Sequence, residues 1–234
     1  MGIILNIETA TSVCSVALGK DGVVIATKEE NQGFSHAEKL TLFIEDVCSQ
    51  AKIKLSDLDA IAVSSGPGSY TGLRIGVSTA KGLCFALDKP LISVSTLCGI
   101  ARGIQNRLLE LKVPLSEDDI LFPMIDARRM EVYRAIYSKH LHEIEGPASQ
   151  VITNPGFFKG YGANQVYLGG DGCGKFLELF ENESNVKILN DVLSSASYLT
   201  QESERKFNSG DIEDTSLFEP FYLKEYIPGK PKGQ

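Results

Sequence analysis

The sequence has no uninterrupted apolar run near the roughly 20 residues that a membrane-spanning helix needs, although 43% of its 234 residues are hydrophobic. Its first residues carry no basic charge and reach Glu8 too early for a secretory signal peptide. These absences predict a cytoplasmic protein with no membrane contact. The length suits one large domain or two modest ones.

Paired cysteines and an excess of basic residues are also missing. The five cysteines are an odd number, lie far apart and include no C-x-x-C pair. Neither a disulfide framework nor a zinc clip is therefore predicted. The formal net charge of -7 argues against this chain alone gripping a phosphate backbone, which needs clustered Lys and Arg. If the chain serves a nucleic acid, a partner has to hold it.

The first hundred residues predict a sheet combined with two helices. Asp21-Gly22 lies where a hairpin turn requires positive φ. Ser35 opens a Ser-x-x-Glu capping box, which is followed by apolar residues at helical spacing. The predicted elements are strands at 3–9, 12–19 and 22–27, a helix that begins at Ser35, a strand at 60–64, a helix from the glycine-rich loop at 65–72 to about Leu87, and a strand at 90–94.

The second half predicts a weaker repeat of the first. One of its strands ends at Asp126, as the first strand of the chain ends at Glu8, and each acid precedes a polar turn. Duplication is the simplest account of this pattern. The predicted elements are a helix near 96–110, strands at 121–125, 131–137 and 166–168, a glycine-rich junction at 169–174, and helices near 174–180 and 193–207.

Four segments, at 4–18, 35–40, 65–76 and 125–133, together resemble the TsaB (YeaZ) family. The resemblance is strong over residues 4–100, fair at 120–137 and faint beyond. Its most specific part is the string from Gly66 to Gly76.

This resemblance implies an α/β protein with a duplicated actin-like ATPase fold, the fold of actin, Hsp70 and sugar kinases. Each lobe should then have a mixed sheet flanked by helices. Residues 1–104 and 212–234 are expected to form the first lobe, and residues 105–211 the second, smaller one.

The resemblance also implies a non-catalytic subunit that pairs with the transferase TsaD, together with the small ATPase TsaE. In that scheme threonylcarbamoyl passes from threonylcarbamoyl-AMP to the N6 amine of the tRNA adenosine next to the anticodon. ATP is used by the complex, tRNA is met only through the complex, and no cofactor is expected to be tightly bound to this chain.

The histidines predict no metal site. Catalytic relatives carry His-x-x-x-His on the first helix, because imidazoles at i and i+4 lie on one helical face and can share a metal. The same spacing here gives His36 and Leu40, so the second ligand is a hydrocarbon. His140 and His142 stand two apart in a polar stretch and alone make a poor site. A lone histidine such as His36 is more often a surface or capping residue.

Nucleotide binding is predicted to be weak or absent. In nucleotide-binding members of this fold, an acid at the end of the first strand orients hydrated magnesium and the following turn holds phosphates. Neither polar turn of this chain contains a glycine, and the second one carries arginines. The simpler alternative is that Glu8 and Asp126 only cap turns at sheet ends. The residues of this vestigial nucleotide site are Glu8, Thr9, Thr11, Ser12, Gly66, Gly68, Asp126 and Arg128.

Two helices are candidates for a partner interface. The second carries a small residue once per turn, which permits another helix to approach closely, and the first is rich in apolar residues. Family resemblance places TsaD, or a second copy of the chain, on these helices, although internal packing fits the pattern equally well. Charging the surface, as in Val47→Asp or Ala80→Glu, should abolish partner binding, or unfold the protein if the surface is core. The predicted partner-binding residues are His36, Leu40, Phe43, Ile44, Val47, Gly72, Gly76 and Ala80.

Catalytic machinery is not evident in the sequence. No histidine stands in a context that would activate a serine or cysteine nucleophile. The alternative function is an independent actin-fold phosphotransferase that uses ATP on a small substrate, which would need a catalytic base and a glycine-bearing phosphate turn. Several arginines are candidates to face a tRNA or an acidic partner, although scattered solvated charge is the commoner explanation. They are Arg102, Arg107, Arg128, Arg129 and Arg134.

Overall fold

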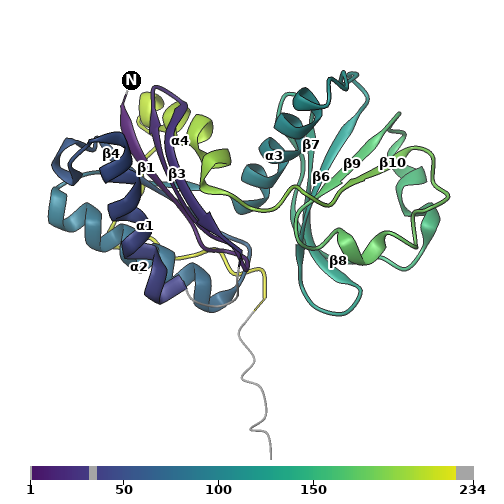
Figure 1. Cartoon of the computed structure of the whole chain (residues 1–234). Coiled ribbons are helices and arrows are strands. Elements are labelled where there is room, and N and C mark those ends of the chain that lie inside the picture. The colour runs from purple at the N-terminus through teal and green to yellow at the C-terminus, as the bar shows by residue number, and fades with distance from the viewer. Residues whose placement is uncertain (1, 32–35, 225–234) are drawn as a thin grey trace, which may run out of the picture.

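The computed structural model describes residues 2–31 and 36–224 and contains two lobes, each built on a five-stranded sheet (Figure 1). The first sheet has the order β3-β2-β1-β4-β5 and the second has the order β10-β9-β6-β7-β8. Read from β8 to β10, the second sheet repeats the strand order of the first. Strands β8, β7, β6, β9 and β10 correspond to β3, β2, β1, β4 and β5. In both sheets the first three strands pair antiparallel and the last two join in parallel. The predicted duplication of a mixed sheet is therefore confirmed.

The strands of the first sheet follow the sequence pattern. Strands β1 and β4 are apolar and buried because helices cover both faces of the sheet. Asp21 and Gly22 have φ of 54° and 76°, as a two-residue hairpin turn requires. The strands are β1 (Ile3–Glu8), β2 (Cys14–Lys20), β3 (Val23–Glu30), β4 (Ala60–Ser64) and β5 (Leu91–Val94).

Two helices, α1 (His36–Ala51) and α2 (Tyr70–Leu87), cover one face of the first sheet. The start of α1 was predicted at Ser35, which lies outside the described residues. Helix α2 begins after Ser69, whose Oγ accepts a hydrogen bond from the Gly72 amide at 3.3 Å. A short 3-10 helix, η1 (Leu55–Asp57), connects α1 to β4.

The second sheet is flanked on its far side by 3-10 helices rather than by a long α-helix. The helix predicted near 174–180 is a single 3-10 turn, because Phe176 and Phe180 turn into an aromatic cluster with Phe158. Strands β8 and β10 were not predicted. The elements are β6 (Ile120–Asp126), β7 (Glu131–Ser138), β8 (Glu143–Val151), β9 (Val166–Gly169), β10 (Val186–Leu189), η2 (Pro155–Tyr161) and η3 (Gly174–Phe176).

Each lobe packs a helix that the predicted division assigned mainly or wholly to the other lobe. Helix α3 (Thr96–Glu110) covers the second sheet, and its buried apolar side chains join the core of that lobe. The segment η4 (Ala196–Leu199) and α4 (Thr200–Ser209) returns to the first sheet, against β1, β2 and β5. The packing units therefore differ from a simple cut at residues 104 and 211, because the last helix of each repeat crosses to the other sheet.

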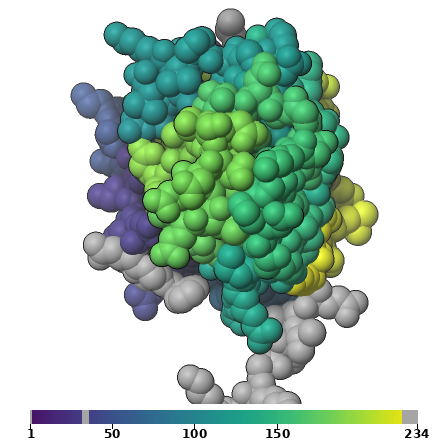
Figure 2. Space-filling view, turned by 90° about the vertical axis from the view of Figure 1, so that its right-hand side faces the viewer, coloured from purple at the N-terminus to yellow at the C-terminus, as the bar shows by residue number. Residues whose placement is uncertain are grey.

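The second lobe occupies one end of the molecule and leaves α1 and α2 at the other end. Figure 2 views the molecule from the side of the second lobe, whose teal and green atoms cover most of that face, while purple atoms of the first lobe are visible at the left margin. Among residues 2–31 and 36–224, no helix has both the length and the apolar character to cross a membrane.

Candidate functional site

The end of β1 holds a buried carboxyl group. Glu8 is only 1% exposed, and its Oε1 accepts hydrogen bonds from the Ala10 amide at 2.6 Å and the Ser64 hydroxyl at 3.0 Å. Burial raises the pKa of Glu8 from 4.5 to about 7. An acid that orients hydrated magnesium presents its oxygens to the ion's water shell. Glu8 instead accepts hydrogen bonds from its own chain. This arrangement fits the simpler alternative, in which Glu8 only caps a polar turn.

The glycine-rich loop packs directly against the turn that follows β1. A Cβ at Gly68 would lie 2.3 Å from the Ala10 carbonyl, and one at Gly72 would lie 2.1 Å from the Thr9 carbonyl. A Cβ at Gly76 would meet the Thr9 hydroxyl at 2.2 Å. That hydroxyl donates to the Gly72 carbonyl at 2.8 Å. These glycines therefore serve close approach within the first lobe.

The other predicted residues of the first phosphate turn also have partners inside the chain. The hydroxyls of Thr11 and Ser194 hydrogen bond to each other at 2.5 Å. Ser12 donates to the Asn31 side chain at 2.8 Å. In the neighbouring glycine-rich loop, Gly66 has φ of 111°, and a Cβ there would lie 2.4 Å from the carbonyl oxygen of Phe221. The turn is thus engaged by the protein itself.

In the second lobe, a lysine occupies the turn between β6 and β7. The Lys175 ammonium donates to the Asp126 carboxylate at 2.6 Å and to the carbonyls of Arg129 and Glu131 at 2.8 and 2.6 Å. Arg128 and Arg129 have φ of 72° and 52°, a left-handed conformation that costs a non-glycine residue roughly 1–2 kcal/mol. Sequence reasoning missed Lys175, because nothing in its local sequence points to this turn.

Asp171 connects the two turns electrostatically. Its Oδ1 accepts a hydrogen bond from the Asp126 amide at 3.0 Å. Desolvation raises the pKa of Asp171, and the charge of Asp171 contributes to raising the pKa of Glu8. Asp171 therefore contacts the turn that follows β6 and acts electrostatically on Glu8 at the end of β1. The signal for Asp171 was present, since it lies in the second-lobe counterpart of the first glycine loop.

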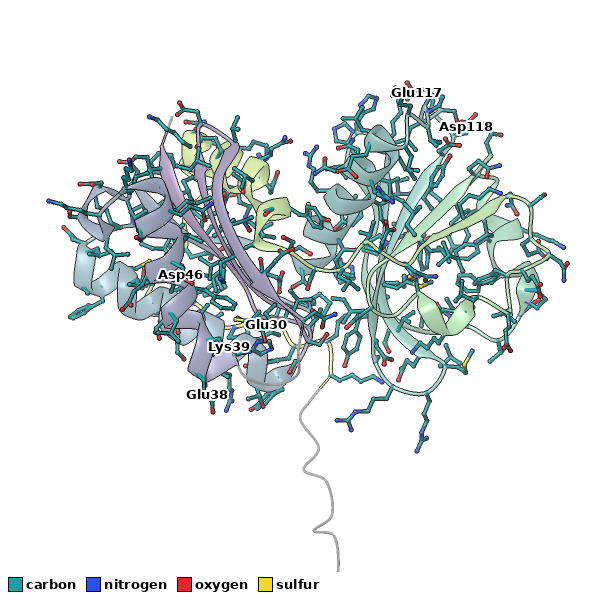
Figure 3. All side chains as sticks on the ribbon, viewed as in Figure 1. Glu30, Glu38, Lys39, Asp46, Glu117 and Asp118 are labelled. Atoms are coloured by element: carbon teal, nitrogen blue, oxygen red, sulfur yellow. The ribbon has the colours of Figure 1, made fainter. Side chains whose placement is uncertain are left out.

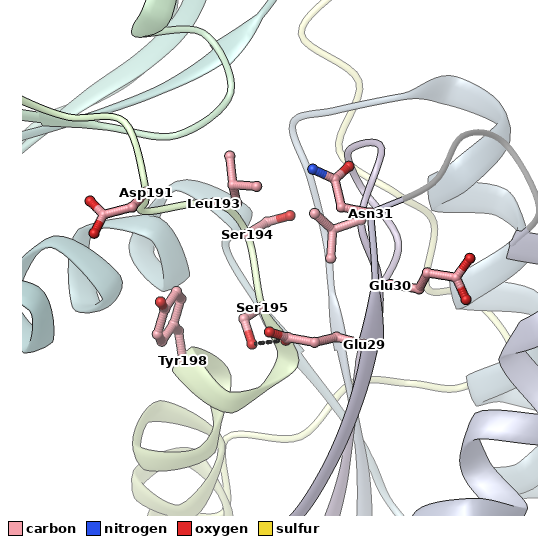
Figure 4. Close-up of a pocket in the computed structure, with 9 residues that line it drawn as sticks. Glu29, Glu30, Asn31, Asp191, Leu193, Ser194, Ser195 and Tyr198 are labelled. Carbon is pink, nitrogen blue, oxygen red and sulfur yellow. Dashed lines mark hydrogen bonds between the residues drawn. The ribbon is translucent and has the colours of Figure 1, made fainter.

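A pocket of about 270 Å³ lies where the end of β3 meets the chain segment before α4 (Figure 4). Glu29 accepts hydrogen bonds there from the hydroxyls of Ser195 and Ser15, at 2.7 and 3.0 Å. The lining includes three carboxylates and no Lys or Arg, so no cation lines the pocket to bind a phosphate. The lining residues are Val13, Glu29, Glu30, Asn31, Asp191, Leu193, Ser194, Ser195 and Tyr198.

All eight residues predicted to bind a partner lie inside the first lobe, which corrects that assignment. Leu40, Phe43, Ile44 and Val47 are between 0% and 6% exposed and belong to the core beneath α1. The buried face of α2 contains the three small residues, which contact the sheet and the turn after β1. The alternative of internal packing therefore holds, because α1 and α2 turn their apolar stripes to the sheet. The eight residues are His36, Leu40, Phe43, Ile44, Val47, Gly72, Gly76 and Ala80.

His36 is a buried residue rather than a surface one. The residue is 2% exposed, and its Nε2 lies 2.9 Å from the carbonyl oxygen of Thr11. His140 is exposed and lies 3.6 Å from Glu117. Within residues 2–31 and 36–224, no three His, Cys, Asp or Glu side chains gather as a metal site would require.

The raised pKa of Glu8 predicts a pH-dependent stability. A buried acid with a folded-state pKa near 7 contributes stability that is full below about pH 4.5 and is lost as the pH rises through 7. Relative to Glu8→Gln, wild type should lose about 2–3 kcal/mol between pH 5 and pH 8. Urea unfolding of both proteins at the two pH values measures this difference. Glu178→Gln, at an exposed site, is the control, and equal pH dependence of wild type and Glu8→Gln would contradict the assignment.

A family model described as "TsaD: tRNA N6-adenosine threonylcarbamoyltransferase" matches residues 24–163, more than half of the chain. The chain belongs to this family. Within it, the chain is similar to the protein named tRNA threonylcarbamoyladenosine biosynthesis protein TsaB of Escherichia coli, at 36% identity over 153 residues. That match covers 65% of this chain and 62% of the relative, less than two thirds of its length. The TsaB of Haemophilus influenzae is 25% identical over 236 residues, which cover 97% of this chain and 95% of the relative.

Solved structures agree with this placement. The structure titled "YeaZ from Pseudomonas aeruginosa" superposes with a TM-score of 0.77 at 28% identity, over 95% of this chain and all of that one. The activator of the 2-hydroxyisocaproyl-CoA dehydratase from Clostridium difficile superposes with a TM-score of 0.52 at 9% identity, which shows a shared fold only. The chain is a TsaB (YeaZ) family protein with the predicted duplicated actin-like ATPase fold.

Proposed function

We propose that this chain is a non-catalytic subunit in the biosynthesis of threonylcarbamoyladenosine in tRNA. It pairs with a TsaD transferase and works with TsaE, and the complex moves threonylcarbamoyl from threonylcarbamoyl-AMP to the adenosine N6 amine. The similarity to proteins named TsaB supports the pathway. The observation that carries the non-catalytic role is the state of the two phosphate turns. Glu8 is buried and hydrogen bonded to its own chain, and Lys175 fills the second turn.

The same geometry argues against the alternative of an independent phosphotransferase. Such an enzyme needs turns open to a nucleotide, whereas here the hydroxyls of Thr9, Thr11 and Ser12 bond within the protein. The pocket where β3 meets the segment before α4 has no Lys or Arg in its lining, which argues against a phosphate-binding site there. In the proposed function, ATP is used by the complex and this chain holds no cofactor tightly.

The docking face for TsaD is assigned to the outward sides of α1 and α2. Phe85 on α2 is 90% exposed and Leu42 on α1 is 56% exposed. Gly82, one turn before Phe85, is exposed, and a Cβ there would meet nothing within 4 Å. A mid-helix glycine destabilises the free helix by roughly 1 kcal/mol relative to alanine. The open space next to Gly82 permits a partner helix to approach closely. Packing within the chain does not explain a glycine at this position, because a Cβ would fit there.

Acidic side chains border this face. Figure 3 shows Glu38 and Asp46 along α1, and both are exposed, as is Glu45. A partner with a complementary basic surface would gain in encounter rate and specificity. Asp46 pairs with Lys28 at 3.6 Å, and α2 adds the exposed cation Arg74, so a second copy of the chain remains the alternative occupant of this face. With TsaD on this face, the tRNA would be met only in the complex.

The experiment is tRNA threonylcarbamoylation with TsaD and TsaE from the same organism, threonylcarbamoyl-AMP and ATP, with and without this chain. We expect modification only when the chain is present, and co-elution of the chain with TsaD in size-exclusion chromatography. Modification that proceeds equally without the chain, and no co-elution, would refute the proposal. ATP turnover by the chain alone would point to the phosphotransferase instead.

A further inference from the structure

The turn between β6 and β7 places two arginines side by side in a backbone conformation that arginine rarely adopts. Arg128 and Arg129 both have positive φ and both are exposed. Glycine or asparagine would fit this conformation without strain. Strained residues persist where the surrounding structure holds them, and they gather at binding and switch sites. The turn is therefore a candidate for a function that needs arginine.

Two lysines from other segments of the chain hold the turn between β6 and β7 in place. Lys175 bonds to the Asp126 carboxylate and to the carbonyls of Arg129 and Glu131. Lys224, from the segment that follows α4, bonds to the Glu131 carboxylate at 2.5 Å. The Asp126 and Glu131 carboxylates thus pair with lysines rather than with an arginine side chain of the turn.

Arg128 and Arg129 differ from the other arginines in the contacts of their side chains. Over residues 2–31 and 36–224, no hydrogen bond or ion pair is found for either guanidinium. Every other arginine has a side-chain partner. The pairs are Arg74 with Tyr222, Arg102 with Gln105, Arg107 with Asp191, Arg134 with Glu145, and Arg205 with Glu202. The two arginines of the turn are therefore available to an external ligand.

Charge and composition around the turn indicate the chemistry of that ligand. Guanidinium groups bind phosphate oxygens in bidentate fashion. The local cluster holds four cations against three carboxylates on a chain whose net charge is -7. Met130 is 37% exposed and Val151, the strand partner of Glu131, is 56% exposed, and these two side chains make only a small apolar surface. A protein partner would require a larger apolar centre. The cluster consists of Arg128, Arg129, Lys175, Lys224, Asp126, Glu131 and Asp171.

We infer that Arg128 and Arg129 form a contact site for the phosphodiester backbone of the RNA on which the complex acts. The inference rests on the proposed function, because an acidic chain needs the complex to bring RNA to this turn. Phosphate contacts position a nucleic acid without reading its sequence. The role of the turn is therefore to orient the RNA on the assembled complex.

The test uses the double variant Arg128→Gly/Arg129→Gly in complex with TsaD. Glycine removes both guanidiniums and relieves the left-handed strain, so the variant should unfold at an equal or higher temperature than wild type. Affinity for a tRNA transcript, measured by fluorescence anisotropy at several salt concentrations, should fall about tenfold or more at low salt. The slope of log K against log salt should become shallower by about 1.5, since each phosphate contact contributes roughly 0.7–0.9.

Lys52→Gly/Lys112→Gly is the matched control. Lys52 and Lys112 are also exposed cations at positive φ, of 58° and 56°, but each stands alone, so tRNA affinity should remain within about twofold of wild type. Unchanged tRNA affinity and salt slope in the arginine variant would overturn the inference. Loss of TsaD co-elution in that variant would also overturn it and assign the turn to a protein contact. A wild-type chain that fails to bind TsaD would instead refute the proposed function itself.

Discussion

Phe85→Asp is expected to abolish the complex with TsaD while leaving the fold intact. Phe85 is 90% exposed, so the change removes almost no internal packing, and surface substitutions of this kind usually alter stability by less than about 0.5 kcal/mol. At the centre of an interface, loss of an aromatic anchor costs about 2–4 kcal/mol, and a buried unpaired carboxylate adds to that cost. The dissociation constant should therefore rise at least about 100-fold in a titration of labelled chain with TsaD.

A matched control separates docking from a general effect of surface charge. Leu109 on α3 is 77% exposed, and α3 lies against the second sheet, away from α1 and α2. Leu109→Asp should bind TsaD as wild type does. Gly82→Leu should weaken binding as Phe85→Asp does, because the added side chain enters the space above α2. Normal binding by both α2 variants would place the interface elsewhere.

Val47→Asp is expected to unfold the first lobe rather than to interrupt docking. Val47 is 0% exposed and lies in the core between α1 and the sheet. A carboxylate there would be buried without a partner, which typically costs more than about 4 kcal/mol, a large part of the roughly 5–15 kcal/mol of a typical protein. Circular dichroism should show a protein that is already unfolded at 25 °C, or a thermal unfolding midpoint that is lower than that of wild type by 10 °C or more.

Thr41→Asp provides the comparison on the same helix. Thr41 is exposed on the outward side of α1, so the same carboxylate should change stability by less than about 0.5 kcal/mol. A well-folded Val47→Asp protein that fails to bind TsaD would contradict the buried position and restore the original interface assignment.

Periodicity in the sequence predicted most of the first lobe. Alternating and continuous apolar runs identified β1, β2, β3 and β4, and the hairpin at Asp21-Gly22 followed from its turn residues. The repeat signalled by Glu8 and Asp126 was real, since each lies at the end of the first strand of its sheet. These features are local, so they can be inferred without tertiary structure.

Features that depend on tertiary packing could not be inferred in this way. Apolar spacing on α1 and α2 shows which face is buried, but not whether a sheet or a partner covers it. The crossing of α3 and α4 between lobes, and the insertion of Lys175 into a turn 46 residues earlier in the chain, have no local signal. The length of the helix near Phe176 was overestimated. The helix ends after a single 3-10 turn, where Phe176 and Phe180 join an aromatic cluster.

The most direct test of a non-catalytic role is the tRNA modification rate with the Glu8→Gln variant in place of the wild-type chain. The account predicts an unchanged rate and unchanged co-elution with TsaD, because this carboxyl group caps a turn and takes no part in the transfer. A variant that still binds TsaD but lowers the rate by tenfold or more would contradict it. That result would assign catalytic work to Glu8 and the turn that follows β1.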